Sequence, residues 1–168
     1  ATNRGENAIA LNPFGLLSRV RDLATVPTVE QDSWTIHIGP MGVFDGTASF
    51  DYDYDDVLEA GAAGMAADAT GGWIGFTEDM AGALIPTGKG KIEAKFRAGS
   101  GDIFQTQIAR ENAQVIAPGK ALTTTTRLFA GAKETALLDT YKDQYHIPLL
   151  NLAVAWVWFS CFASPLYS

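Results

Sequence analysis

The sequence predicts a mainly β protein: a β-sandwich with short helices and an apolar helix at its C-terminal end. Several segments alternate apolar and polar side chains with a period of two, which is typical of half-buried strands. In contrast, the 25 residues from Gln144 to Ser168 contain no Asp, Glu, Lys or Arg. We therefore divide the chain into a β body over residues 1–146 and an apolar segment over residues 147–168.

The overall composition excludes several classes of protein. The chain has 168 residues, enough for one domain, and only 18% of them are charged, against about 25% in ordinary soluble domains. Its net charge of −7 disfavours binding to nucleic acid, because the phosphate backbone would repel it. An acidic balance also fits the outer side of a bacterial membrane, since positive residues are retained on the cytoplasmic side. The single cysteine, Cys161, excludes an internal disulfide.

The first quarter of the chain predicts strands separated by turns. We expect a strand over Asn7–Val20, bent at Asn12-Pro13 because proline is poor inside a ladder. Residues 21–32 predict a loop, and Ser33–Ile38 alternates as a strand. A short apolar run, Gly42–Phe44, lies between two turn signals.

The middle of the chain predicts a strand, a connection and a helix. Thr47–Asp56 alternates acidic with aromatic side chains, which favours a half-buried strand. Residues 60–72 are small, so we expect a flexible connection. Large apolar residues from Trp73 to Leu84 fall at helical spacing, and Pro86 would end that helix.

The following segments predict four strands and a helix. The four expected strands are Ile92–Ala98, Phe104–Ile108, Gln114–Ala117 and Ala121–Ala130, the last of them rich in β-branched threonine. Lys133–Tyr145 has the apolar spacing of a short amphipathic helix.

The apolar segment, with its core at Leu149–Ala163, allows three interpretations. It could be a buried helix, it could span the bilayer, which needs about 20 apolar residues, or it could lie at the membrane interface. We favour the interface, because tryptophan rings settle at the depth of the lipid headgroups. The expected membrane-interface residues are Trp156, Trp158, Phe159 and Phe162.

The motifs that would indicate an enzyme or a metal site are incomplete. The acidic run Asp51–Asp56 lacks the glycine and glutamate that an EF-hand loop requires at its sixth and twelfth positions. Thr87–Gly90 lacks the hydroxyl residue after the lysine of a phosphate-binding loop. His37 and His146 are the only histidines, and no nucleophile elbow accompanies them. We therefore expect no catalytic residue, no cofactor and no bound metal.

Five stretches, in one order along the chain, resemble the YidC family of membrane protein insertases. They are Ile36–Gly46, Tyr52–Val57, Gly71–Pro86, Arg127–Tyr141 and Ile147–Tyr167. The chain departs from the family pattern at Ile38, where the family has Glu. Ala155, Val157 and Ser164 likewise replace an expected Asp, Gly and Lys, which removes polar residues near the membrane.

The resemblance implies a position and a role. The chain would be the C-terminal part of the large periplasmic domain, a supersandwich-like β-sandwich on the periplasmic side of the bacterial inner membrane, with residues 147–168 leading to a transmembrane segment. It would be a scaffold and partner-contact module in the insertion and folding of inner-membrane proteins. The implied partners are the Sec translocon with its auxiliary Sec subunits, nascent membrane proteins and the lipid bilayer surface.

Two other functions fit the residues. The alternating aromatic and acidic side chains at residues 50–56 suit a carbohydrate-type ligand-binding sandwich without enzymatic activity, which would need them to converge on a pocket. A structural domain with a membrane anchor unrelated to insertion is the other alternative.

Overall fold

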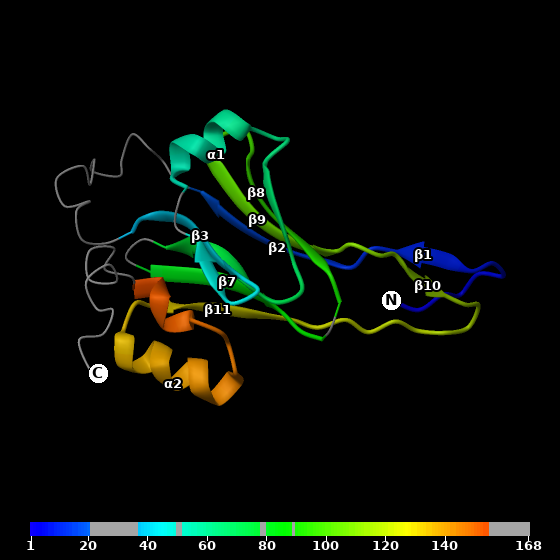
Figure 1. Ribbon diagram of the computed structural model, residues 1–168. Coiled ribbons are helices and arrows are strands. Elements are labelled where there is room, and N and C mark those ends of the chain that lie inside the picture. Colours follow the sequence, from blue (N-terminus) through cyan, green and yellow to red (C-terminus); the bar gives the residue numbers. More distant parts are fainter. Residues whose placement is uncertain (21–36, 50–51, 78–79, 89, 155–168) are drawn as a thin grey trace.

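A computed structural model describes residues 1–20, 37–49, 52–77, 80–88 and 90–154. Two antiparallel sheets pack face to face, a helical layer covers the outer face of one of them, and a narrow two-stranded arm projects from the body (Figure 1). The prediction of a mainly β protein is confirmed.

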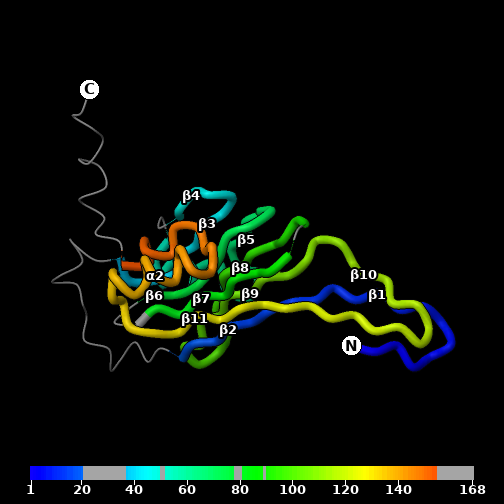
Figure 2. The backbone as a smooth tube through the Cα atoms, turned by 90° about the horizontal axis from the view of Figure 1, so that it is seen from below, coloured from blue at the N-terminus to red at the C-terminus, as the bar shows by residue number. Residues whose placement is uncertain are grey.

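The strands form three antiparallel sheets. The five-stranded sheet has the order β11 (Thr126–Ala132), β7 (Met80–Pro86), β6 (Gly72–Thr77), β3 (Gly39–Phe44), β4 (Thr47–Ser49). The four-stranded sheet has the order β2 (Phe14–Val20), β9 (Ile103–Arg110), β8 (Ile92–Ala98), β5 (Met65–Ala69). The arm pairs β1 (Ile9–Leu11) with β10 (Gln114–Ile116) and extends away from both sheets (Figure 2). The bend expected at Asn12-Pro13 separates β1 from β2, as predicted.

The main core lies between the two sheets. β8 shows why its sequence alternates: Ile92, Ala94 and Phe96 face the core, while the residues between them are half-buried on the other face. Aromatic rings fill the centre, with Tyr54 against Phe104 at 4.6 Å between centroids in an edge arrangement, a favourable geometry for such pairs.

A second core lies on the outer face of the five-stranded sheet. Two helical elements cover that face: α2 (Thr135–Tyr145) and the 3-10 helix η2 (Leu150–Val154). The sheet contributes Trp73 and Ala83 to this core, and the helical layer contributes Leu138 and Leu150, both fully buried. The helix predicted over Lys133–Tyr145 is thereby confirmed as α2.

The helix predicted over Trp73–Leu84 is wrong, because this segment forms the paired strands β6 and β7. Both faces of β6 are covered, one by the main core and the other by the second core. A strand buried on both faces has no polar residues to mark a period of two, so its apolar spacing resembles that of a helix.

The strand predicted over Thr47–Asp56 is confirmed over Thr47–Ser49 and is wrong at its end, where α1 (Tyr54–Ala60) begins. The acidic run forms a capping box: Asp53 Oδ1 accepts from the backbone N–H of Asp56 at 3.0 Å, and the Asp56 carboxylate accepts from the backbone N–H of Asp53 at 2.9 Å. Such a box satisfies donors that a helix start leaves unpaired. The capping hydrogen bonds of Asp53 and Asp56 therefore favour a helix here, although the side chains alternate as they do in a strand.

Two further boundaries differ from the sequence prediction. Part of the flexible connection expected over residues 60–72 is β5, an edge strand paired with β8. Gly64, directly before β5, approaches β8 closely: a Cβ there would lie 2.3 Å from the carbonyl oxygen of Phe96. The strand expected over Ala121–Ala130 begins only at Thr126, and Ala121 instead bridges to Thr2 in the arm.

A carboxylate in the turn between β3 and β4 is hydrogen-bonded to the connection between β5 and β6, and it predicts a pH effect. Asp45 Oδ1 accepts from the Thr70 hydroxyl at 2.7 Å and from the backbone N–H groups of Thr70 and Gly71. These bonds, led by the Thr70 hydroxyl, lower the pKa of Asp45 below its usual 3.8. Because the folded pKa is the lower one, this stabilisation is present above the unfolded pKa, and it is lost as the pH falls through the folded pKa.

We expect Asp45→Asn to flatten the dependence of unfolding free energy on pH below about pH 4. Urea denaturation of both proteins at a series of pH values measures this. Equal slopes for the parent and the variant on the acid side would contradict the assignment.

Candidate functional site

The sequence-predicted membrane-interface residues Trp156, Trp158, Phe159 and Phe162 lie outside the described residues. The segment that leads to them is described, however, and it is held firmly. We call Ile147–Val154 the C-terminal anchor, since it packs on the outer face of β6.

The end of α2 returns the chain to the sheet. His146 adopts the left-handed conformation with φ 52° and ψ 47°, which commonly ends a helix. The backbone N–H of Ile147 then donates to the Lys142 carbonyl at 3.0 Å. Ile147 is 5% exposed and Leu150 is fully buried, so the anchor is part of the second core.

Two side chains of β6 hold the anchor by hydrogen bonds. The indole N–H of Trp73 donates to the Pro148 carbonyl at 2.8 Å, and the Thr77 hydroxyl donates to the Ala153 carbonyl at 3.2 Å. Both side chains are almost wholly buried. The bonds thus satisfy carbonyl groups at both ends of the anchor.

Replacing the Thr77 hydroxyl tests one of these bonds. We expect Thr77→Val to lower the free energy of unfolding by about 1–3 kcal/mol, because the buried Ala153 carbonyl loses its donor. Thr106→Val is the matched control: Thr106 is equally buried, but its Oγ1 has no hydrogen-bond partner among the described residues. Chemical denaturation should show little loss for the control, and equal losses for both variants would contradict the role of Thr77.

An apolar groove runs beside the anchor, between β11 and α2. Its volume is about 540 Å³. The groove is lined by Ile85, Arg127, Leu128, Phe129, Ala130, Tyr141, Tyr145 and Ile147. Among the described residues, the lining therefore combines mostly apolar and aromatic side chains with one cation and no carboxylate.

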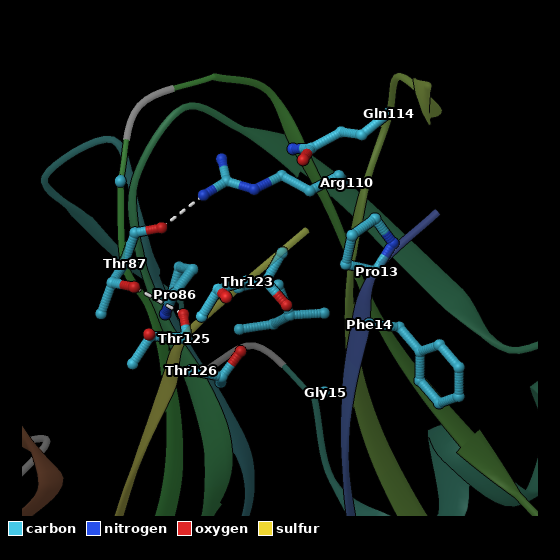
Figure 3. A pocket seen from close by; sticks show the side chains of 13 residues that line it. Pro13, Phe14, Gly15, Pro86, Thr87, Arg110, Gln114, Thr123, Thr125 and Thr126 are labelled. Carbon is cyan, nitrogen blue, oxygen red and sulfur yellow. Dashed lines mark hydrogen bonds between the residues drawn. The ribbon is translucent and has the colours of Figure 1, made fainter. Parts of the chain in front are cut away.

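A second cavity of about 350 Å³ lies where β2, β7 and the residues before β11 come together (Figure 3). Its wall is rich in threonine hydroxyls, and Arg110 reaches across it to the carbonyl oxygens of Thr87 and Gly90. The Phe14 ring points away from the threonines (Figure 3). Arg110 thus ties two strand ends together, which is a structural role.

The described part of the chain offers little for metal chemistry. It holds no group of three His, Cys, Asp or Glu residues placed to share a metal ion. His37, within the strand predicted over Ser33–Ile38, lies half-buried outside any strand, with Nε2 2.8 Å from the Pro40 carbonyl oxygen.

The described residues of the stretch that suggested a carbohydrate site, 52–56, do not converge on a pocket. Tyr54 is buried in the main core, Tyr52 is 39% exposed and Asp53 caps α1. The ligand-binding alternative is therefore not favoured.

The comparison with protein families decides the identity. The family described as the YidC periplasmic domain matches residues 1–168. This chain belongs to that family. The resemblance found in the sequence motifs is thus confirmed, and the family places the YidC periplasmic domain in an inner-membrane protein.

Curated relatives agree with the family assignment. The membrane protein insertase YidC of Zymomonas mobilis is 35% identical over 160 residues, covering 94% of this chain and 27% of the relative. Those of Methylorubrum extorquens and Acidiphilium cryptum are each 33% identical, cover 98% of this chain, and are themselves covered over 28% and 29% of their length. The chain thus spans less than a third of these relatives. None of the helices in the described residues is long and apolar enough to cross a bilayer.

Sequence reasoning missed the anchor residues of this YidC periplasmic domain. Trp73 and Thr77 were assigned to a helix, so their spacing on one strand went unseen. The absence of polar residues in Gly72–Phe76 could have indicated a strand that is buried on both faces, and therefore a second layer packed on the outer face of the sheet.

Proposed function

We propose that this chain is the scaffold of a membrane protein insertase: it holds the segment that leads to the membrane in a fixed place, while other parts of the protein carry out insertion. The observation that carries the proposal is the C-terminal anchor. A segment bonded to Trp73 and Thr77 and buried at Leu150 moves with the sheet. Whatever follows Val154 is therefore positioned by the body.

An inserted linker tests the scaffold role without disturbing the core. In the full-length protein, a flexible Gly-Ser linker placed after Val154 leaves the anchor seated but uncouples the body from the following segment. We expect insertion of a model inner-membrane protein in cells to fall severalfold. The control places the same linker after Gly101, in the open turn between β8 and β9. Unchanged insertion by the Val154 variant, at normal protein level, would refute the scaffold role.

The proposal keeps residues 147–168 as the membrane-directed segment, with Trp156, Trp158, Phe159 and Phe162 at the lipid interface. The uncharged, aromatic composition of this segment supports it. Brominated lipids quench tryptophan at short range, so the full-length protein in vesicles should lose part of its quenching in the double variant Trp156→Phe with Trp158→Phe. Quenching that is identical in parent and variant would place these rings away from lipid.

We also propose that the sheet edges receive partners, namely the Sec translocon with its auxiliary Sec subunits, and nascent membrane proteins. Among the described strands, β2 and β11 each have one neighbour, and Phe14, Val20 and Leu128 on them are more than half exposed. Open apolar edges favour strand addition. A photocrosslinker at Leu16 in the full-length protein should capture such a partner, and one at Asp68, on the far edge strand β5, should not. Equal adducts at both positions would contradict this proposal.

A further inference from the structure

The groove between β11 and α2 combines features that suit an anionic amphiphile. Its floor is apolar, with Ile85 and Ile147 less than a tenth exposed. Its aromatic wall is continuous: Phe129 and Tyr141 lie 6.0 Å apart between ring centroids, and Tyr141 and Tyr145 lie 5.8 Å apart. A groove of this size and apolar character fits a hydrocarbon chain.

Among the described residues that line the groove, Arg127 alone is charged. Its Nη1 donates to the Tyr145 carbonyl at 3.2 Å, and the guanidinium lies 5.9 Å from the centre of the Tyr145 ring. Both interactions fix the guanidinium at the groove and leave its charge without a carboxylate among the lining residues. A guanidinium has five N–H donors in a planar fork that suits a phosphate group, so donors remain for an anion.

Charge complementarity therefore selects the occupant. The whole chain has a net charge of −7, yet the part of the groove lining that the structure describes carries one cation and no acid. Tyr145, 44% exposed, lies beside Arg127. An amphipathic tyrosine and a cation above an apolar floor together match the boundary between lipid headgroup and acyl chain.

We propose that this groove binds one anionic phospholipid, with the phosphate at Arg127 and an acyl segment along Ile85, Phe129 and Ile147. The groove shares Ile147 with the C-terminal anchor. A bound lipid therefore contacts the layer that leads to the apolar segment. The inference goes beyond the scaffold role and does not require it.

Photoaffinity labelling of the full-length protein tests the site. The protein is reconstituted in phosphatidylcholine vesicles containing a photoactivatable phosphatidylglycerol, and adducts are mapped by mass spectrometry. We expect adducts on the peptides that hold residues 127–130 and 141–147, and a roughly tenfold loss of them in Arg127→Gln, since a charge-assisted bond is removed. Arg4→Gln, an exposed change on the arm, is the matched control.

Three further arms decide between occupants. A photoactivatable phosphatidylcholine probe should label the groove weakly, and excess inorganic phosphate should not displace phosphatidylglycerol if the acyl segment contributes. A photocrosslinker at Tyr145, in the aromatic wall of the groove, should yield lipid adducts in cells. Equal labelling by both lipids, full displacement by phosphate, or polypeptide adducts at Tyr145 in place of lipid would each overturn the proposal.

Discussion

Replacing Gly72 with alanine should nearly abolish the folded state. Gly72 opens β6 with φ +124°, and an added Cβ would lie 1.7 Å from the carbonyl oxygen of Val43 on the neighbouring strand β3. That clash is with backbone, so a side-chain rotation cannot relieve it. We expect a loss of more than about 4 kcal/mol of unfolding free energy, a magnitude confined to severe core or backbone defects.

The adjacent glycine is the matched control. Gly71 has open space around its Cβ position and does not require a positive φ. Gly71→Ala should therefore change stability by less than about 1 kcal/mol. Thermal denaturation and the yield of folded protein distinguish the two variants. A Gly72→Ala protein as stable as Gly71→Ala would mean that β6 does not approach β3 in this way.

Truncating Leu138 should cost about 2–5 kcal/mol of unfolding free energy. Leu138 is the residue of α2 that is fully buried against the sheet, in the second core with Leu150 and Ile147. Leu138→Ala loses the transfer free energy of the side chain and leaves a cavity. The loss should also loosen the anchor, because the same core holds both.

The neighbouring residue gives the control for this change. Leu137 lies on the same helix and is 37% exposed, so Leu137→Ala should cost less than about 1 kcal/mol. Chemical denaturation of the two variants measures the difference. If Leu137→Ala were the more destabilising change, the face of α2 that packs on the sheet would have to be reassigned.

The sequence predicted best those strands that bury one face. β8 and β9 alternate because one side faces the main core and the other is only half-buried, so period two survives in their residues. The bend between β1 and β2 was predicted as well, since Pro13 interrupts the ladder. In these places local pattern and tertiary environment agree.

The sequence failed where tertiary cover changes the pattern. β6 is buried on both faces, so Trp73 and Phe76 read as helical neighbours although they point to opposite cores. At α1, the side chain of Asp53 stabilises a helix start that the alternation of Tyr52 and Tyr54 concealed. The anchor could not be predicted at all, because it depends on β6 and residues 147–154 meeting across more than 70 positions of sequence.

Exchange of the Trp73 indole proton tests the C-terminal anchor most directly. The full-length protein is labelled with ¹⁵N-tryptophan, and the resonance of Trp73 is identified by its loss in Trp73→Phe. Trp73 is 1% exposed and donates to the Pro148 carbonyl, so its proton should exchange only on opening of the second core, as slowly as core amides. Exchange near the rate of a free indole would show that residues 147–154 do not lie on β6.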